Sequence, residues 1–155
     1  NVPMDPRTEN VRRFELVSSQ AGPYFEASHV GRGASFGDLD NDGDTDIVLN
    51  PKDGRAAILR NDSTDQGHWL RFQLRATQSQ PDLIGSKIQV VIGPRTVYRQ
   101  KKGGGSLEGS NDPRPLVGVG PQESVETVIV RWPSGRETVL KDVRTDQTLD
   151  LTEPE

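Results

Sequence analysis

The sequence predicts an all-β fold, and three features support this prediction. Short stretches of β-branched or alternating apolar residues recur along the chain, separated by Gly, Pro, Asn and Asp. No segment shows the 3.6-residue apolar repeat of an amphipathic helix. The 16 Gly and 11 Pro among 155 residues indicate many turns, yet stay below the share typical of low-complexity disorder. We therefore expect a β-sandwich or barrel.

Composition excludes several classes of protein. The chain has no Cys, so it has no disulfide framework, and no apolar run approaches the ~18 residues that span a bilayer, so we expect no membrane insertion. The net charge of −4 and the aromatic content of 5% disfavour nucleic acid as a partner. The chain starts without an initiator Met, which leads us to expect a piece of a larger chain.

The first part of the chain predicts a small sheet. Residues 1–10 are polar and Pro-rich without periodicity, which predicts a flexible lead-in. Four short stretches bounded by turn residues then have the spacing of a four-stranded meander: residues 13–17, 33–36, 46–49 and 56–60.

The strand predicted at 68–76 alternates strictly between two sides. One side carries the apolar residues Leu70, Phe72 and Leu74. The other carries Trp69, Arg71, Gln73 and Arg75. This period of two is typical of a half-buried strand, with the apolar side facing a core and the polar side facing solvent.

Further strands continue this pattern to the end of the chain. They are predicted at residues 87–92, 96–100, 116–119, 125–132, 137–140 and 148–151. Residues 132–136 (WPSGR) predict a tight turn between two of them.

The segment 37–49 (GDLDNDGDTDIVL) carries the most specific chemical signal. Counted from Asp38, carboxylates stand at positions 1, 3, 5, 7 and 9, and Gly43 stands at position 6, where a sharp turn needs a residue without Cβ. Five carboxylates this close repel one another unless a cation compensates them. We expect Ca²⁺, with these ligands: the side chains of Asp38, Asp40, Asp42 and Asp46, and the carbonyl of Asp44.

The loop has two other interpretations. An EF-hand would need a Glu at position 12, where Leu49 stands inside an apolar run, so the loop leads into a strand. An Asp-rich turn without metal is the other. A structural calcium ion favours a secreted, extracellular or periplasmic setting, because weak extracellular sites fill only outside a cell.

The sequence resembles a known family combination. Residues 31–62 resemble an FG-GAP/VCBS repeat, the calcium-binding blade of integrin-like β-propellers, and the remainder resembles the ASPIC/UnbV domain of the cartilage acidic protein group. The matching stretches are HWLRFQL at 68–74, IGSKIQVVIG at 84–93, SNDPR at 110–114, VGVG at 117–120 and VETVIVRWPSGRETVL at 125–140. The Gly-rich stretch departs from the family pattern, since Ser106-Leu107 and Pro115-Leu116 replace an aromatic residue and a His.

The resemblance implies a domain organisation and a ligand set. Residues 11–66 would form a calcium-binding blade and residues 68–152 an ASPIC/UnbV-like β-domain. The calcium ligands of the family fall on the five Asp residues of the loop. Because a single blade cannot bury both of its faces, we expect it to pack as a small propeller-blade-like sheet on the sandwich or barrel.

A basic surface is the candidate binding site. Residues 68–114 carry eight basic and three acidic side chains. The residues proposed to bind a ligand are Trp69, Arg71, Arg75, Arg95, Arg99 and Lys101, on two strands whose faces would have to coincide. Arg forks match carboxylate and sulfate geometry and aromatic rings stack on sugars, which favours an acidic polysaccharide. The alternative is a solvated sheet face.

Three functional hypotheses follow. The first is a non-catalytic, calcium-stabilised carbohydrate-binding module of a larger secreted protein. The second, by analogy with integrin-like propellers, is a protein-interaction or adhesion domain. The third, an enzyme, has the least support, because the sequence shows no Cys, two distant His and only a loose pair of carboxylates, Glu108 and Asp112.

Overall fold

The computed structural model describes residues 15–52, 54–63, 67–105 and 107–155. The chain divides into two compact units, residues 1–30 and residues 31–155. The predicted lead-in at 1–10 lies outside the described residues. No helix in the described part of the chain is long and apolar enough to cross a membrane.

The described part of the first unit, residues 15–30, contains two short 3₁₀ helices, η2 (Ser18–Gln20) and η3 (Pro23–Glu26). The ring of Tyr24 stacks on His29, with ring centroids 4.1 Å apart. The predicted strand at 13–17 is wrong over its described part, residues 15–17, which pair with no other strand. The reason is local, because the carbonyl of Val17 accepts a hydrogen bond from the N–H of Gln20 and so opens a 3₁₀ turn.

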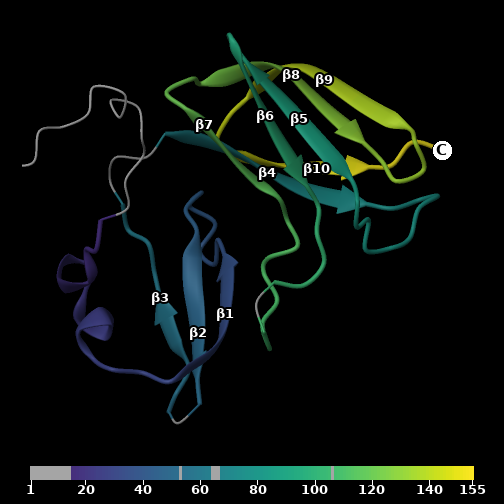
Figure 1. The fold of residues 1–155 in the computed structure, drawn as a ribbon. Helices are drawn as coiled ribbons and strands as arrows, with labels where there is room; N and C mark the ends of the chain where they lie inside the picture. Colours follow the sequence, from purple (N-terminus) through teal and green to yellow (C-terminus); the bar gives the residue numbers. More distant parts are fainter. Residues whose placement is uncertain (1–14, 53, 64–66, 106) are drawn as a thin grey trace, which may run out of the picture. The chain divides into compact units, whose positions relative to one another are not determined.

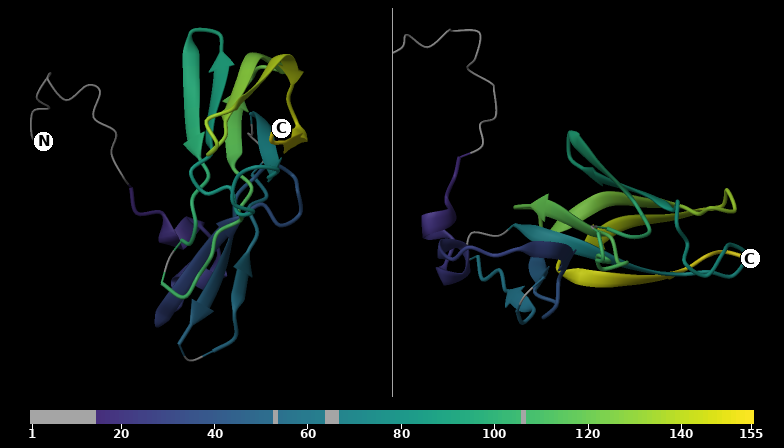
Figure 2. Two further views of the ribbon diagram at one scale, coloured as in Figure 1. Left: turned by 90° about the vertical axis from the view of Figure 1, so that its right-hand side faces the viewer. Right: turned by 60° about the horizontal axis from the view of Figure 1, so that its bottom comes forward.

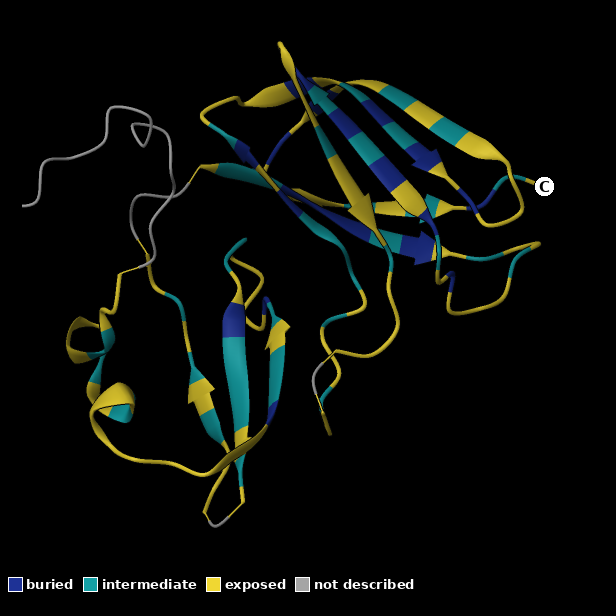
Figure 3. Cartoon of the chain, in the orientation of Figure 1, coloured by how far each residue is buried: buried dark blue, intermediate teal, exposed yellow. Residues whose placement is uncertain are grey.

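The second unit is all-β and contains three sheets (Figure 1). The first is antiparallel, in the order β1 (Gly31–Gly37), β2 (Asp46–Pro51), β3 (Ala57–Leu59). Its strands match three of the four predicted for the meander. None of the apolar side chains of these strands is fully buried, and Figure 3 shows them mainly as intermediate or exposed.

The other two sheets form a β-sandwich, seen as two layers in Figure 2. One layer has the order β10 (Gln147–Thr152), β4 (His68–Arg75), β7 (Leu116–Gly120), with β10 parallel to β4. The other is antiparallel, in the order β6 (Arg95–Gln100), β5 (Lys87–Ile92), β8 (Ser124–Arg131), β9 (Glu137–Arg144). Of the two predicted forms, the sandwich is the one observed.

The core lies between these two layers. The apolar side of β4 supplies Leu70 and Phe72, both fully buried, as the alternation of this strand predicts. Opposite them, the alternate residues Ile88, Val90 and Ile92 of β5 are buried. The remaining buried apolar residues are Leu74, Leu83, Val117, Val119, Val125, Val128, Val130, Trp132 and Val143.

The segment between β6 and β7 joins the three-stranded sheet to the sandwich. The N–H of Asp112 donates to the carbonyl of Phe36 at 2.9 Å, and the N–H of Phe36 donates to the side-chain oxygen of Asn111 at 3.0 Å. A Cβ on Gly33 would lie 2.9 Å from the carbonyl oxygen of Leu107, so this position needs glycine. Residues 107–112 therefore cover the free edge of β1 and link the small sheet to the sandwich.

Candidate cation site and binding surfaces

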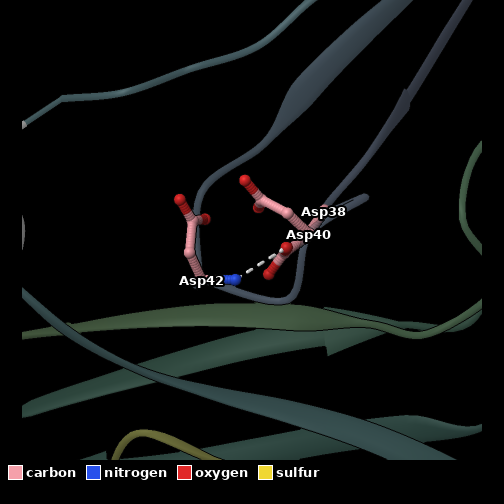
Figure 4. Close-up of side chains that lie close together, drawn as sticks. All are labelled: Asp38, Asp40 and Asp42. Carbon is pink, nitrogen blue, oxygen red and sulfur yellow. Dashed lines mark hydrogen bonds between the residues drawn. The ribbon is translucent and has the colours of Figure 1, made fainter.

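The loop between β1 and β2 brings three carboxylates together. Oxygens of Asp38, Asp40 and Asp42 lie within 4.8 Å of one another, and Figure 4 shows the three side chains around the loop. Asp38 is buried, whereas Asp40 and Asp42 are exposed. A donor set made only of carboxylate oxygens suits a hard cation.

Hydrogen bonds to the buried carboxylate shape this loop. Asp38 accepts the N–H of Asp42 at 3.1 Å, drawn as a dashed line in Figure 4, and the N–H of Gly43 at 2.8 Å. Gly43 has a φ of +100°, in the left-handed region that glycine tolerates best. Glycine at position 6 of the loop is therefore required by the backbone, as its spacing predicts.

The carboxylate of Asp46 lies outside this cluster of three, and the predicted carbonyl ligand of Asp44 stays a prediction. Asp46 is buried, and its two oxygens accept the N–H groups of Leu39 and Asn61 at 2.8 and 2.9 Å. Asp46, the first residue of β2, is therefore bonded both to the start of the loop at Leu39 and to the chain that follows β3 at Asn61. Burial, followed by the charges of Asp42, Asp46 and Asp40, raises the pKa of Asp44. The neighbouring carboxylates thus add to the effect of burial on Asp44.

Arg71 crosses from the sandwich to this loop. Its side chain is 2% exposed and donates to the carboxylate of Asp38 and, at 2.8 Å, to the side-chain oxygen of Asn41. Burial, with a smaller contribution from the charge of Arg114, lowers the pKa of its guanidinium. The expectation that Arg71 belongs to a solvent-exposed basic platform is wrong, because the Asp-rich loop covers this part of β4.

A second arginine binds the same loop from the segment between β6 and β7. Arg114 forms a two-point pair with Asp112, donates to Asn41 at 3.1 Å and reaches the carbonyl of Asp38 at 3.3 Å. Burial opposes ionisation of Asp112, but the hydrogen bonds and charge of Arg114 outweigh it and lower the pKa of this carboxyl. Sequence reasoning assigned no contact to Asp112 or Arg114, although the quoted SNDPR stretch contains both.

Trp69 packs directly on the loop. A Cβ placed on Gly43 would lie 2.0 Å from a carbon of the Trp69 ring, so the indole occupies the space a side chain would need. The guanidinium carbon of Arg71 lies 4.8 Å from the ring centroid, in cation–π range. Trp69 also lines an open groove of about 480 Å³ with Gly43, Asp44 and His68.

The remaining predicted binding residues do not form one platform. The strands that carry them, β4 and β6, belong to different sheets. Arg75 is exposed and pairs with Asp150 at 2.7 Å. Arg95 and Arg99 donate to the carbonyls of Val119 and Leu116 on β7, and Lys101 donates to the carbonyl of Pro113 at 2.6 Å. The predicted coincidence of the two faces is therefore wrong.

The register of the four-stranded sheet explains where these arginines point. Arg95 and Arg99 lie opposite the buried Ile92 and Ile88 of β5, on the side that faces the sandwich interior. Because β6 is an edge strand, their long side chains reach across to β7 and close the edge. The other side of β6 faces outward and carries Thr96, Tyr98 and Gln100.

The outward residues form a surface centred on Tyr98, here named the Tyr98 face. It comprises Lys87, Gln89, Tyr98, Gln100, Lys102 and Arg131. Tyr98 is 66% exposed and lies opposite Gln89, which lies opposite Ile129. Lys87 lies opposite Gln100 and Arg131 in the next row.

Two hollows flank the Tyr98 ring on this face. The larger one, of about 580 Å³, is open and lined by Lys87, Tyr98, Arg99, Gln100 and Lys102. The smaller one, of about 90 Å³, is lined by apolar and polar residues of β5, β6 and β8. Arg131 is held by Glu137 at 2.7 Å, so the two lysines supply most of the positive charge of the face.

Fold and site together define an all-β sandwich domain with an Asp-rich loop held against one of its sheets. The chain belongs to the ASPIC and UnbV family, whose model matches residues 76–155, more than half of the chain. No curated protein matches the chain significantly. The ASPIC/UnbV part of the resemblance is thus confirmed, while the FG-GAP/VCBS part, which lies outside the matched residues, stays a prediction.

Proposed function

We propose that the chain is a non-catalytic, calcium-stabilised carbohydrate-binding module of a larger secreted protein, and that it binds an acidic polysaccharide through the Tyr98 face. The observation that carries this proposal is a highly exposed aromatic ring on a regular sheet, flanked by Lys87 and Lys102. An exposed ring contributes little to the stability of the fold, but it offers an apolar surface with a polar hydroxyl tip to a ligand. No catalytic step is proposed.

The chemistry of this face suits an anionic glycan. The Tyr98 ring can stack on the apolar face of a sugar, while Gln89 and Gln100 supply amide donors and acceptors for hydroxyl groups. The ammonium groups of Lys87 and Lys102 add charge-assisted hydrogen bonds to carboxylates or sulfates. A strand scaffold keeps these groups at fixed spacing, which lowers the entropic cost of binding.

Calcium would be held by the loop next to the sandwich. The side chains available for it are Asp38, Asp40 and Asp42, whose oxygens already converge. When bound, the ion would supply compensating charge to this crowded loop and no chemistry on a ligand. Arg71 and Arg114 already place two positive charges against the same loop, so the ion would share the carboxylate of Asp38 with Arg71.

The FG-GAP/VCBS interpretation and a secreted location are parts of the same proposal. The three-stranded sheet has apolar residues on both faces, since Phe36, Ile47 and Leu59 lie in one row and Val48 and Ile58 in the next. A blade of a propeller has this pattern because neighbouring blades cover both of its sides. If the loop binds calcium with the roughly 10⁻⁴ to 10⁻³ M affinity of extracellular modules, it would be filled only outside cells, in keeping with the proposed secretion.

A second candidate function rests on the same sheet. Phe36, Leu39 and Ile58 are 43%, 53% and 67% exposed, which leaves apolar area available for a protein partner. The chain would then be a protein-interaction or adhesion domain that ends an integrin-like β-propeller.

Affinity gel electrophoresis tests the first proposal against the second. The full chain would migrate in calcium through gels that contain sulfated, uronic-acid or neutral polysaccharides. We expect retardation by an anionic class, lost in Tyr98→Ala and largely kept in Tyr98→Phe, because the phenyl ring still stacks. Ile58→Ala, an equally exposed position on the other sheet, serves as the control and should behave as wild type. Unretarded migration in every gel would refute carbohydrate binding.

A further inference from the structure

A cavity of about 330 Å³ opens at the end of the sandwich, beside the Tyr98 face. Its walls come from the end of β4, the turn at 81–84 and two parts of the segment between β6 and β7. This volume lies at the lower end of the range for small-molecule sites. Lys102 lines both this cavity and the open hollow next to Tyr98, so the two spaces adjoin.

Two lysines give the cavity its charge. The backbone of Lys101 is fixed by hydrogen bonds with Gly85 and Ser86, both 2.9 Å long. Its ammonium donates to the carbonyl of Pro113, which occupies one of its three donors. Burial lowers the pKa of Lys101, with Asp112 and Asp82 acting in the opposite direction, and the charge of a bound anion would further favour the ammonium form.

The acidic residue that lines the cavity is already engaged. Asp82 accepts the N–H of Ile84 at 3.1 Å within its own turn. The two lysines therefore outnumber the carboxylate, and the lining has a net positive charge. Ser110, Asn111 and Gln73 add neutral groups that can bind hydroxyls.

Glycines shape the wall between the two lysines and these polar groups. Gly104 has a φ of +70°, and a Cβ on Gly103 would lie 2.7 Å from the end of the Ile84 side chain. Gly105 approaches Asn111 so closely that a Cβ there would lie 2.9 Å from the amide oxygen. The backbone at Gly103 and Gly104 therefore forms this part of the wall without side chains of its own.

We propose that this cavity is a subsite for one acidic sugar residue of the polysaccharide, with its carboxylate or sulfate bound by Lys101 and Lys102. This inference rests on the proposed function, because the next sugar along the chain would reach the Tyr98 ring past Lys102. The positive lining would give a preference for anionic over neutral glycans, which stacking on Tyr98 alone would not provide.

NMR titration of the ¹⁵N-labelled full chain with single sugars tests the subsite. A single sugar in the cavity does not extend to the Tyr98 ring, so its binding does not depend on that residue. The probes are glucuronic acid, glucose 6-sulfate and glucose, which separate carboxylate from sulfate and both from the neutral ring. We expect saturable shifts of the Gly103 and Gly104 amides with at least one acid, and none with glucose. Lys102→Ala should weaken this binding about fivefold, the effect of one partly solvated charge pair. Lys141→Ala, an exposed lysine on β9, is the matched control.

The outcomes separate the subsite from the proposed function. Equal weakening by the two lysine variants, or shifts spread over all basic surfaces, would overturn the subsite. A second result would also overturn the subsite: the wild type retains acidic and neutral polymers equally, and Tyr98→Ala loses this retention. The proposal of carbohydrate binding would then still stand. Saturable binding of an acidic sugar at Gly103 and Gly104 supports the subsite, whatever the effect of Tyr98→Ala. If Tyr98→Ala binds polymers as the wild type does, the role of the Tyr98 face is refuted.

Discussion

At the scale of single residues, Arg71 is the charge that joins the Asp-rich loop to the sandwich. It is buried, pairs with the buried Asp38 and lies against the Trp69 ring. A buried ion pair contributes little net stability compared with an apolar pair, yet removal of one partner leaves the other charge uncompensated. The pair is therefore sensitive to single substitutions.

This sensitivity gives a direct comparison between two arginines of one strand. We predict that Arg71→Met lowers the free energy of unfolding by about 3–5 kcal/mol, because Asp38 loses its buried cation. Arg75→Met, at an exposed pair with Asp150, should cost no more than about 1 kcal/mol. Urea denaturation of both variants in calcium-free buffer measures the difference. Similar losses in the two variants would show that the Arg71 pair is solvated.

The sequence places Arg71 on the polar side of its strand but says nothing about what covers that side. Alternation assigns Arg71 and Arg75 to the same face, and the structure agrees. The loop that buries Arg71 comes from some thirty positions earlier, and such non-local contacts leave no periodic signal. Glu153 was missed for the same reason: it is buried, and its carboxylate accepts the N–H groups of Thr77, Gln78 and Ser79.

At the scale of elements, the Asp-rich loop and β4 are fitted to each other at Gly43 and Trp69. The indole fills the space over the glycine, so the loop lies closer to the strand than any side chain at position 43 would allow. The contact makes the loop part of the fold of the sandwich. It also explains why a Trp stands on the polar side of β4.

A pair of glycine variants tests this fit. Gly43 and Gly135 both have positive φ, +100° and +89°, but a Cβ on Gly135 would meet nothing within 4 Å. Gly135→Ala should therefore cost only the backbone strain of roughly 1–2 kcal/mol. Gly43→Ala should cost roughly 1–3 kcal/mol more, because the indole must move. Chemical denaturation of the two variants gives the difference, and equal costs would show that Trp69 does not pack on the loop.

Most strands could be predicted because their signals are local. The alternation of 87–92 and the turn residues at 132–136 suffice to place β5 and the β8–β9 turn. Strand pairing could not be predicted in this way, since β10 lies parallel to β4 although about seventy residues separate them. The prediction of a basic platform was wrong for this reason. Arg95 and Arg99 do share one face of β6, but their side chains donate to carbonyls of β7.

At the scale of the whole molecule, the unit 31–155 combines a small sheet without a core of its own and a sandwich with one. Polar contacts between them involve Asp38, Asn41, Arg71, Asp112 and Arg114. The indole of Trp69 packs on Gly43 beside them. The calcium ion that we propose would add to the charge compensation that the two arginines already provide.

Calorimetric melting of the full chain in calcium and in EDTA tests the proposed calcium site most directly. At a hundredfold excess over its Kd, calcium should stabilise the native state by about 2.7 kcal/mol, which raises Tm by roughly 5 to 10 °C for a chain of this size. Asp42→Ala should abolish the difference between the two buffers, whereas Asp62→Ala, at an exposed Asp that pairs with Arg60, should preserve it. A wild-type Tm that is the same in calcium and in EDTA would contradict the account.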